Sequence, residues 1–335
     1  MSGGPLGLAV LGCGRMGRRH IAAAVAAPGV RLLAVGDPVP GTAAAAAPHG
    51  VEAFEDVGAM LDRGDIEAVV IAAPSPLHVE LTRRCLSAGK HVLVEKPVGL
   101  DPAAAENLAD DATRARRVLA VGYWRRHAWP YVEAARLLGA GAIGEPRLVR
   151  ASQWDATPPP PAFCDPAVSG GIEIDCGVHE IDVTTWLLGS PPVWIAAAGL
   201  AGDPAISATG DVEAAAVLVR TATGTVATID LARSVGYDDD VRTEVVGARG
   251  ALLVRASGTG ELWLGDGDGL RRLPGRDVDV LADALARQLE AFGATARRAA
   301  RGVTEIVDVG TAAATLRVAL AAREARLRGE AVVLA

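Results

Sequence analysis

Lysine is nearly absent from this chain of 335 residues. Only Lys90 and Lys96 occur, against 31 arginines among the 33 basic residues. Arginine cannot lose its proton in a protein, whereas a partly buried lysine can have its pKa lowered and can donate or accept a proton. Lys96 comes directly after the apolar stretch 92–94 and Glu95. A lysine at the end of a strand therefore points to chemistry, with an ordinary surface lysine as the alternative.

Several other features are scarce, and each excludes a class of protein. No uncharged apolar run reaches the roughly 18 residues that cross a bilayer, and no basic stretch followed by an apolar one marks a signal peptide. The net charge is −7, which argues against nucleic acid or an anionic membrane as partner. The cysteines are few and show no paired spacing: Cys13, Cys85, Cys164 and Cys176. We therefore expect a cytoplasmic protein with reduced thiols.

A glycine-rich motif follows the first apolar run. Residues 6–11 predict a buried strand, 12–17 read Gly-Cys-Gly-Arg-Met-Gly, and 18–27 have helical character. This strand–motif–helix order is the one in which G-x-G-x-x-G binds a dinucleotide. Gly12 permits the tight turn, Gly14 lets the backbone approach a pyrophosphate, and Gly17 lets the helix pack closely on the strand.

An acidic residue stands at the end of the next strand. Residues 30–36 are apolar apart from Arg31, and Asp37 lies 20 residues after Gly17. A carboxylate there accepts hydrogen bonds from the adenosine ribose and repels a 2′-phosphate. No basic residue follows it in Pro38-Val39-Pro40, so NAD is expected in preference to NADP. The alternative is a turn or helix-capping acid.

Further strands are predicted at 68–72, 92–94 and 118–121, with helices between them. Alternating strands and helices predict an α/β fold with a doubly wound parallel sheet, whose ligands bind at the carboxyl ends of the strands. Ser75, His78, Lys96 and Trp124 lie at those ends. A contact of His78 with the nicotinamide end is one interpretation, and a structural histidine at a helix start is the other.

The second half begins with a helix from Arg125 to Leu138, a strand over 146–154 and a loop over 155–167 with four prolines at 158–161. That loop is stiff enough to shape a pocket wall, although a plain surface loop is equally consistent. A helix is then predicted over 172–188, in which Asp175, His179, Asp182 and Trp186 share one face. The Asp175–His179 pair suits general acid–base catalysis, with a solvated helix face as the alternative. Cys176 points away from Asp175, so no metal site is expected.

Short strands at 214–221, 225–231, 242–246, 251–254 and 261–264 predict a large, mainly antiparallel sheet. Helices are predicted at 278–300 and 304–328. We expect a Rossmann domain at residues 1–123 and a substrate-binding and oligomerisation α/β domain at 124–335, with the helix at about 304–328 able to pack back on the first domain. Such an open sheet needs a partner for its second face, so a homo-oligomer is expected.

The motifs resemble the glucose–fructose oxidoreductase / inositol dehydrogenase family. They are the glycine motif, Ala-Ala-Pro-Ser-Pro-Leu-His-Val-Glu, Ala-Gly-Lys-His-Val-Leu-Val-Glu-Lys-Pro, Gly-Tyr-Trp-Arg-Arg-His and Gly-Ala-Ile-Gly-Glu-Pro. The stretch 170–189 is most similar to the inositol-dehydrogenase branch. The resemblance implies dimers or tetramers built through the C-terminal sheet and a cis Lys96–Pro97 peptide that aims the lysine at the substrate.

The resemblance also implies catalytic roles for Lys96, Asp175 and His179, and contacts to a cofactor and a small polyhydroxylated substrate. The expected cofactor contacts are Gly12, Gly14, Arg15, Met16, Gly17, Asp37, Ala73, Pro74, Ser75, His78, Glu95 and Lys96. The expected substrate contacts are Lys96, Trp124, Arg126, Trp154, Asp155, Asp175 and His179. Acidic residues (Asp155, Asp165, Glu173) would suit an amino group on the substrate.

The function that follows is NAD-dependent oxidation of a secondary alcohol of a cyclitol, sugar or aminosugar, in which the cofactor carries the chemistry and no metal is needed. His179 accepts the hydroxyl proton, Asp175 orients the ring, and Lys96 stabilises the charge that develops on the oxygen. Two alternatives stay open. One is a ketoreductase of a sugar or aminocyclitol pathway that uses the same site, and the other is a dinucleotide-binding regulator without turnover.

Overall fold

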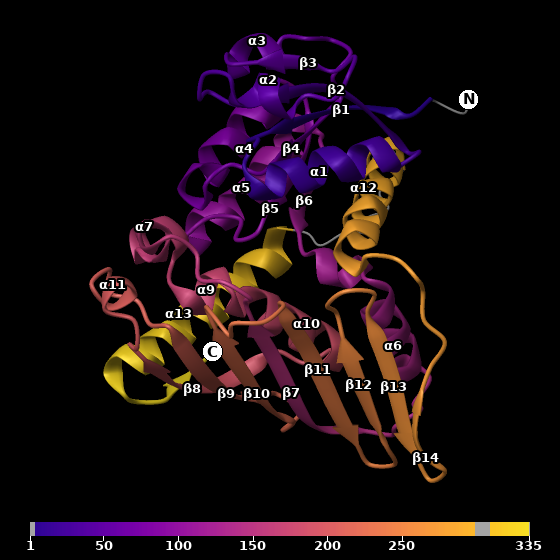
Figure 1. Cartoon of the computed structure of the whole chain (residues 1–335), viewed down its shortest axis with the longest axis vertical. Coiled ribbons are helices and arrows are strands. Elements are labelled where there is room, and N and C mark those ends of the chain that lie inside the picture. Colours follow the sequence, from indigo (N-terminus) through magenta and orange to yellow (C-terminus); the bar gives the residue numbers. More distant parts are fainter. Residues whose placement is uncertain (1–3, 299–308, 335) are drawn as a thin grey trace. The chain divides into compact units, whose positions relative to one another are not determined.

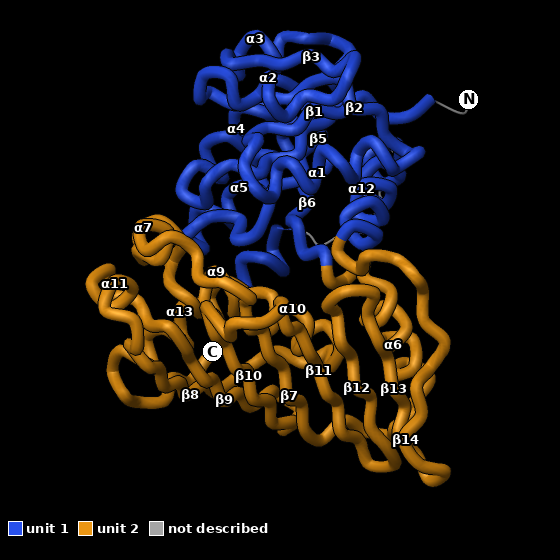
Figure 2. Tube along the Cα trace, in the orientation of Figure 1, with its two compact units in different colours: residues 1–124, 282–314 blue, residues 125–281, 315–335 orange. Residues whose placement is uncertain are grey.

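The computed structural model describes residues 4–298 and 309–334, which group into two compact units (Figure 2). The N-terminal unit contains residues 1–124 and 282–314, and the second contains residues 125–281 and 315–335. The boundary at residues 281/282 falls inside the long helix α12 (Val280–Arg298), and the boundary at 314/315 falls inside α13 (Val309–Arg328). Residues 282–314 therefore group with the N-terminal unit although they follow residues 125–281 of the second unit in sequence.

A six-stranded parallel sheet forms the centre of the N-terminal unit (Figure 1). Its order is β3-β2-β1-β4-β5-β6, with the strands β1 (Leu6–Leu11), β2 (Val30–Gly36), β3 (Glu52–Phe54), β4 (Ala68–Ile71), β5 (His91–Glu95) and β6 (Leu119–Gly122). Every residue of β1 and β4 is buried, as in a parallel sheet covered on both faces. The strand order changes direction at β1, the position at which such folds bind dinucleotides. The predicted Rossmann sheet is confirmed.

Helices connect these parallel strands. They are α1 (Arg15–Ala26), α2 (Thr42–Ala46), α3 (Val57–Leu61), the 3₁₀ helix η1 (Ser75–Leu77), α4 (His78–Ser87) and α5 (Pro102–Ala115). Two of them begin at aspartates whose side chains accept a hydrogen bond from the first turn: Asp56 before α3 and Asp101 before α5. α1 has no such cap, because Gly14 stands at its N-cap position.

The second unit contains a nine-stranded sheet in the order β14-β13-β12-β11-β7-β10-β9-β8-β15. Its strands are β7 (Pro146–Trp154), β8 (Pro192–Leu200), β9 (Ala214–Thr221), β10 (Val226–Ala232), β11 (Asp240–Gly247), β12 (Ala251–Arg255), β13 (Glu261–Asp266), β14 (Gly269–Arg272) and β15 (Val332–Val333). β7 and β10 pair in parallel and the other neighbours are antiparallel. The expectation of a large, mainly antiparallel sheet is confirmed.

The helices that follow Tyr123 up to residue 207 also belong to this unit, apart from Trp124 of η2, which belongs to the first. They are η2 (Trp124–His127), α6 (Trp129–Gly139), α7 (Pro161–Cys164), α8 (Pro166–Ser169), α9 (Ile172–Asp175), α10 (Gly177–Leu188) and α11 (Pro204–Ser207). α10 packs on β7 and β10, and α6 packs on β12 and β13. Along β9, Val217 and Val219 are buried whereas Ala216, Leu218 and Arg220 are exposed. The sheet therefore has one packed and one open face.

Two predicted helices and one predicted loop differ from the observed structure. The helix expected from Arg125 begins at Trp129, because Pro130 belongs in a first turn. The helix expected over 172–188 is divided into α9 and α10 at Cys176, next to Gly177, a poor helix former that packs against Leu231. Pro161 of the proline-rich loop starts α7, a position that proline tolerates.

Some boundaries and strands were not predicted. Of the expected helices at 278–300 and 304–328, residues 299–300 and 304–308 lie outside the described residues. The sequence did not predict β3, β8, β14 or β15. β8 escapes prediction because it begins at Pro192: proline disfavours the interior of a strand but is accepted at its first position.

Candidate active site

The glycine loop has the geometry that its motif predicts. Gly12 has φ +91°, and a Cβ there would lie 2.7 Å from the backbone of Ala72 and Ala73. A Cβ on Gly17 would lie 1.8 Å from the carbonyl oxygen of Gly12. A Cβ on Gly14, by contrast, would meet no protein atom within 4 Å. Packing therefore requires glycine at positions 12 and 17, whereas space beside Gly14 is left for another molecule.

The first turn of α1 is suited to an anion. No side chain caps it and no acidic residue lies in it, so its amide groups present a partial positive charge. Arg15 is exposed and Met16 is half-buried at this end. Together with the open side of Gly14, this turn fits the pyrophosphate of a dinucleotide.

Asp37 is held by the backbone of the same loop. One carboxylate oxygen accepts a hydrogen bond from Cys13 N at 2.8 Å and the other accepts one from Val39 N at 3.0 Å. Burial and the Asp37 charge raise the pKa of the Cys13 thiol to about 11, so that thiol stays protonated at neutral pH. Each carboxylate oxygen keeps a further lone pair, as ribose binding requires.

At the end of β4, His78 has two backbone partners. Ala73, Pro74 and Ser75 lead into η1, and only His78 of this group is buried. Its Nδ1 lies 2.7 Å from the carbonyl oxygen of Pro97 and its Nε2 lies 2.8 Å from that of Ala73. Burial lowers the pKa of His78, against the two carbonyls, which favour a protonated ring. Both ring nitrogens are thus already engaged, which favours the structural interpretation, and the contact with the nicotinamide end remains a prediction.

Glu95, one of the expected cofactor contacts, also has a partner within the fold. Its carboxylate is buried and lies 2.6 Å from Nε2 of His20. Burial acts to raise the pKa of Glu95, but the hydrogen bond with His20 and nearby charges outweigh it and hold that pKa below its usual value. Lys96 follows, half-buried, and its peptide with Pro97 is cis, as the resemblance implies. The sequence analysis missed His20. The available signal was its position among the buried residues of α1.

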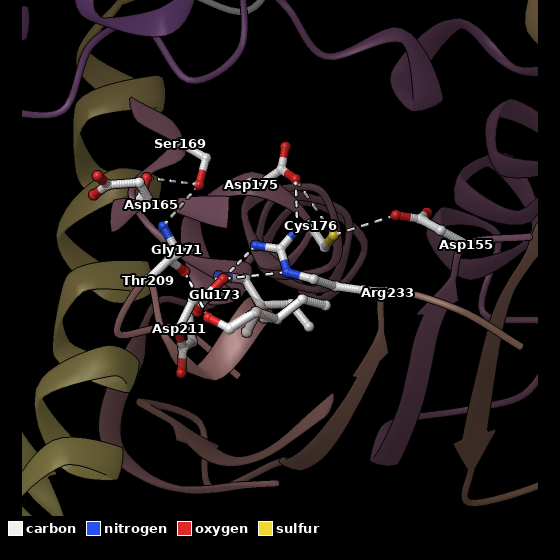
Figure 3. Close-up of polar contacts among 12 residues, drawn as sticks. Asp155, Asp165, Ser169, Gly171, Glu173, Asp175, Cys176, Thr209, Asp211 and Arg233 are labelled. Atoms are coloured by element: carbon white, nitrogen blue, oxygen red, sulfur yellow. Dashed lines mark hydrogen bonds and ion pairs between the residues drawn. The ribbon is translucent and has the colours of Figure 1, made fainter. Parts of the chain in front are cut away.

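In the second unit, Asp175 and His179 lie on either side of the break between α9 and α10. His179 is 6 % exposed, and Asp175 is half-buried. The Asp175 carboxylate accepts a hydrogen bond from Nη1 of Arg233 at 3.2 Å (Figure 3). The expected Asp175–His179 hydrogen bond remains a prediction, and the structure adds Arg233 as a partner of Asp175.

Arg233 belongs to a buried charged network. Its Nη2 lies 2.5 Å from the carboxylate of Asp211, and both side chains are completely buried (Figure 3). The nearby carboxylates raise the pKa of Arg233 against the effect of burial, so it is a permanent cation. Asp211 also accepts a hydrogen bond from Ile172 N at 3.2 Å. This network therefore fixes the start of α9, the helix that ends at Asp175.

The acidic residues expected near an amino group already have partners. Glu173 is buried and pairs with Arg326 of α13. Asp165 accepts a hydrogen bond from Ala167 N at 2.8 Å and caps α8. Asp155 accepts one from Gln153 at 3.0 Å and lies 3.7 Å from the Cys176 sulfur. Glu173 is thus neutralised by a cation, whereas Asp155 and Asp165 accept hydrogen bonds from neutral groups, so their contact with an amino-bearing substrate remains a prediction.

Arg126, one of the expected substrate contacts, is likewise bound within the fold. Its guanidinium binds Asp182 in bidentate fashion, at 2.9 and 2.6 Å, and lies 5.6 Å from the ring centroid of Trp186. Asp182 and Trp186, which share a helix face with His179, therefore contact Arg126 within the fold. Of the other expected substrate contacts, Trp124 is buried and Trp154 is half-buried at the end of β7.

Known proteins resemble this chain along nearly its whole length. Residues 6–123 match the oxidoreductase family with an NAD-binding Rossmann fold, and residues 131–253 match the GFO/IDH/MocA C-terminal domain. The rhizopine catabolism protein MocA of Rhizobium meliloti is 34 % identical over 95 % of this chain and 94 % of its own length. The inositol 2-dehydrogenase of Rhizobium meliloti strain 1021 is 32 % identical over 87 % of this chain and 88 % of its own.

A solved structure is also similar to this chain. The scyllo-inositol dehydrogenase from Lactobacillus casei with bound NAD(H) and scyllo-inositol superposes with a TM-score of 0.83, at 27 % identity, over 98 % of this chain and 99 % of that one. Fold and glycine loop together define an oxidoreductase with an NAD-binding Rossmann domain. The chain belongs to the GFO/IDH/MocA family.

Proposed function

We propose that this enzyme oxidises a secondary alcohol of a cyclitol or sugar to a ketone, with NAD as the hydride acceptor. The observation that carries the proposal is the end-to-end similarity to proteins named as inositol dehydrogenases, at 32 % identity in one case. An aminosugar is the alternative substrate; of the three acids that suggested it, Glu173 is paired with Arg326. The alternative is the reverse reaction, reduction of a ketone at the same site, because the same residues would act in oxidation and in reduction.

The roles proposed for the residues follow from their chemistry. A neutral His179 accepts the proton of the substrate hydroxyl, and Lys96 donates a hydrogen bond to the same oxygen as its negative charge develops. Asp175 favours the orientation of the imidazole that leaves one nitrogen for the substrate. NAD, when bound, takes up the hydride. Gly14, the first turn of α1 and Asp37 would hold it.

Turnover tests the proposal. The purified protein is offered inositols, aldoses and aminosugars with NAD or NADP, and nicotinamide absorbance is followed. Oxidation of at least one cyclitol or sugar supports the proposal. Reduction of keto-sugars without any oxidation would assign the opposite direction, and failure of every compound in both directions would contradict the proposed reaction.

We further propose that NAD is preferred over NADP, because Asp37 carries a charge beside the expected ribose site and no basic residue follows it. Asp37→Ala should narrow the ratio of kcat/KM for NAD to that for NADP, mainly by weakening NAD. Kinetics with both cofactors measure this ratio. Asp56→Ala, which removes another exposed acid of the same unit, is the control and should leave the ratio unchanged. A parent enzyme faster with NADP would contradict the assignment.

We also propose a homodimer or homotetramer formed through the open face of the nine-stranded sheet. Apolar side chains are exposed on it, including Leu148, Leu218 and Val246, and an apolar hollow lies beside Trp154 and Leu200. Burying them on a second copy would remove apolar surface from water. Leu218→Asp should shift the sedimentation coefficient to that of a smaller species, whereas Leu327→Asp, on the exposed side of α13, should not. A parent protein that sediments as a monomer would exclude the assembly.

A further inference from the structure

The segment Glu95–Lys96–Pro97 is held by two buried histidines. The Glu95 carboxylate lies 2.6 Å from Nε2 of His20, and the Pro97 carbonyl oxygen lies 2.7 Å from Nδ1 of His78. The other oxygen of Glu95 accepts a hydrogen bond from the backbone N–H of Lys96 at 3.2 Å. The residue proposed to touch the reacting oxygen is therefore fixed on both sides by its sequence neighbours.

His20 is committed to this one contact. Its ring is completely buried on α1, and among the described residues its Nδ1 has no hydrogen-bond partner. Its single hydrogen bond therefore goes to Glu95, which fixes the proton on Nε2. A hydrogen bond that a carboxylate accepts is charge-assisted and stronger than one between neutral groups.

The carboxylate of Glu95 has little freedom to move. Glu95 lies opposite Gly122 at the ends of β5 and β6. A Cβ on Gly122 would lie 3.0 to 3.2 Å from three atoms of the Glu95 carboxyl group. Glycine at that position thus leaves the space that the carboxylate occupies, and His20 determines where in it the carboxylate stays.

We propose that His20 is a positioning residue for Lys96, acting through Glu95. The path runs from α1, whose first turn faces the expected pyrophosphate, through His20 and the Glu95 carboxylate to the backbone N–H of Lys96. This inference rests on the role proposed for Lys96. A shift of about 1 Å in a reacting group can cost about 10²-fold in rate, so loss of this contact should lower kcat without removing any group that touches substrate.

The near absence of lysine gives a readout that needs neither substrate nor cofactor. In protein grown with lysine labelled with ¹³C at the ε-carbon, only Lys90 and Lys96 contribute side-chain signals. Lys90 is buried, and its ammonium group donates hydrogen bonds to the carbonyls of Arg63 and Ile66, so it serves as an internal reference. His20→Leu should move the Lys96 signal and leave the Lys90 signal in place. An unchanged Lys96 signal would overturn the proposal.

A double-mutant cycle provides the kinetic test, with the polyol and NAD selected by the turnover panel. His20→Leu should lower kcat by about 10- to 100-fold, and NADH affinity, measured by fluorescence, should change little. His20→Gln, which keeps an N–H donor, should recover much of the loss. In the Lys96→Met background, His20→Leu should have almost no further effect, because interacting residues are not additive. If His20→Leu lowered kcat by the same factor in the Lys96→Met background as in the parent, His20 would only support the fold, and the proposal would be overturned.

His91→Leu is the matched control. His91 lies on the same strand as Glu95, and its Nδ1 accepts a hydrogen bond from Val118 N at 2.9 Å. This variant should leave the Lys96 signal and kcat near parental values. If His20→Leu does not fold, Glu95→Gln replaces it in both tests, with the same outcomes. Failure of the proposed function would be seen separately, as a Lys96→Met enzyme with parental kcat.

Discussion

Replacing His179 with alanine is expected to lower kcat by about 10²- to 10⁴-fold, the contribution of a positioned general base. His179 belongs to α10 in the second unit, whereas the glycine loop and Asp37 belong to the first. The affinity for NADH, measured by fluorescence titration, should therefore change little. His49→Ala, which removes an exposed histidine, is the control and should retain parental kcat.

The pH profile of the same variant makes the test more specific. A protonated imidazole cannot accept the hydroxyl proton, so oxidation by the parent enzyme should weaken toward acidic pH. His179→Ala should lose this acidic limb along with most of its turnover. Asp175→Asn should cost less than His179→Ala, because the imidazole would remain. A His179→Ala enzyme with near-parental kcat and the same acidic limb would assign the base role to Lys96.

Replacing Arg233 with methionine is expected to lower the free energy of unfolding by about 3–5 kcal/mol, as found when one partner of a buried ion pair is removed. The substitution keeps a long side chain but leaves the fully buried Asp211 without its closest cation. Asp175 would lose its hydrogen bond from Arg233 as well. Urea unfolding of this variant and of the parent measures the difference in the free energy of unfolding.

The control for Arg233 is Arg136→Met, which breaks an exposed pair with Glu133 on α6. Exposed pairs contribute about 0–1 kcal/mol, so this variant should unfold near the parental urea concentration. Adding Asp211→Leu to Arg233→Met should restore part of the lost stability, since it removes the fully buried carboxylate that Arg233→Met leaves uncompensated. Equal stability of the Arg233 and Arg136 variants would show that the network does not stabilise the fold.

The parts of the structure that the sequence predicted depend on local patterns. The Rossmann sheet follows from apolar strands with glycine and aspartate at fixed distances, and the second sheet follows from alternating residues between short turns. The glycine roles at 12 and 17 could be predicted because they concern backbone geometry within one turn. The positions of Asp37 and Lys96 could be predicted because both stand at the ends of strands.

The partners of these residues could not be predicted in the same way. His20 and Glu95 are 75 residues apart, and Arg233 and Asp175 are 58 apart, so only tertiary packing brings them together. A signal for Arg233 was present, because alternation places it on the buried side with Ile229 and Leu231. A buried arginine on that face implies a carboxylate partner. The identity of the partner required the fold.

Asp37 has two roles, one in the glycine loop and one expected in cofactor selectivity. These two roles restrict how the enzyme could evolve from NAD to NADP. The same carboxylate expected to discriminate against the 2′-phosphate also accepts the hydrogen bond of Cys13 N within the glycine loop. A mutation to alanine would relax selectivity and remove a support of the loop in one step. Asparagine keeps an oxygen acceptor for Cys13 N while removing the charge. An evolutionary or engineered route from NAD toward NADP should therefore pass more easily through Asn at this position, with a basic residue acquired afterwards.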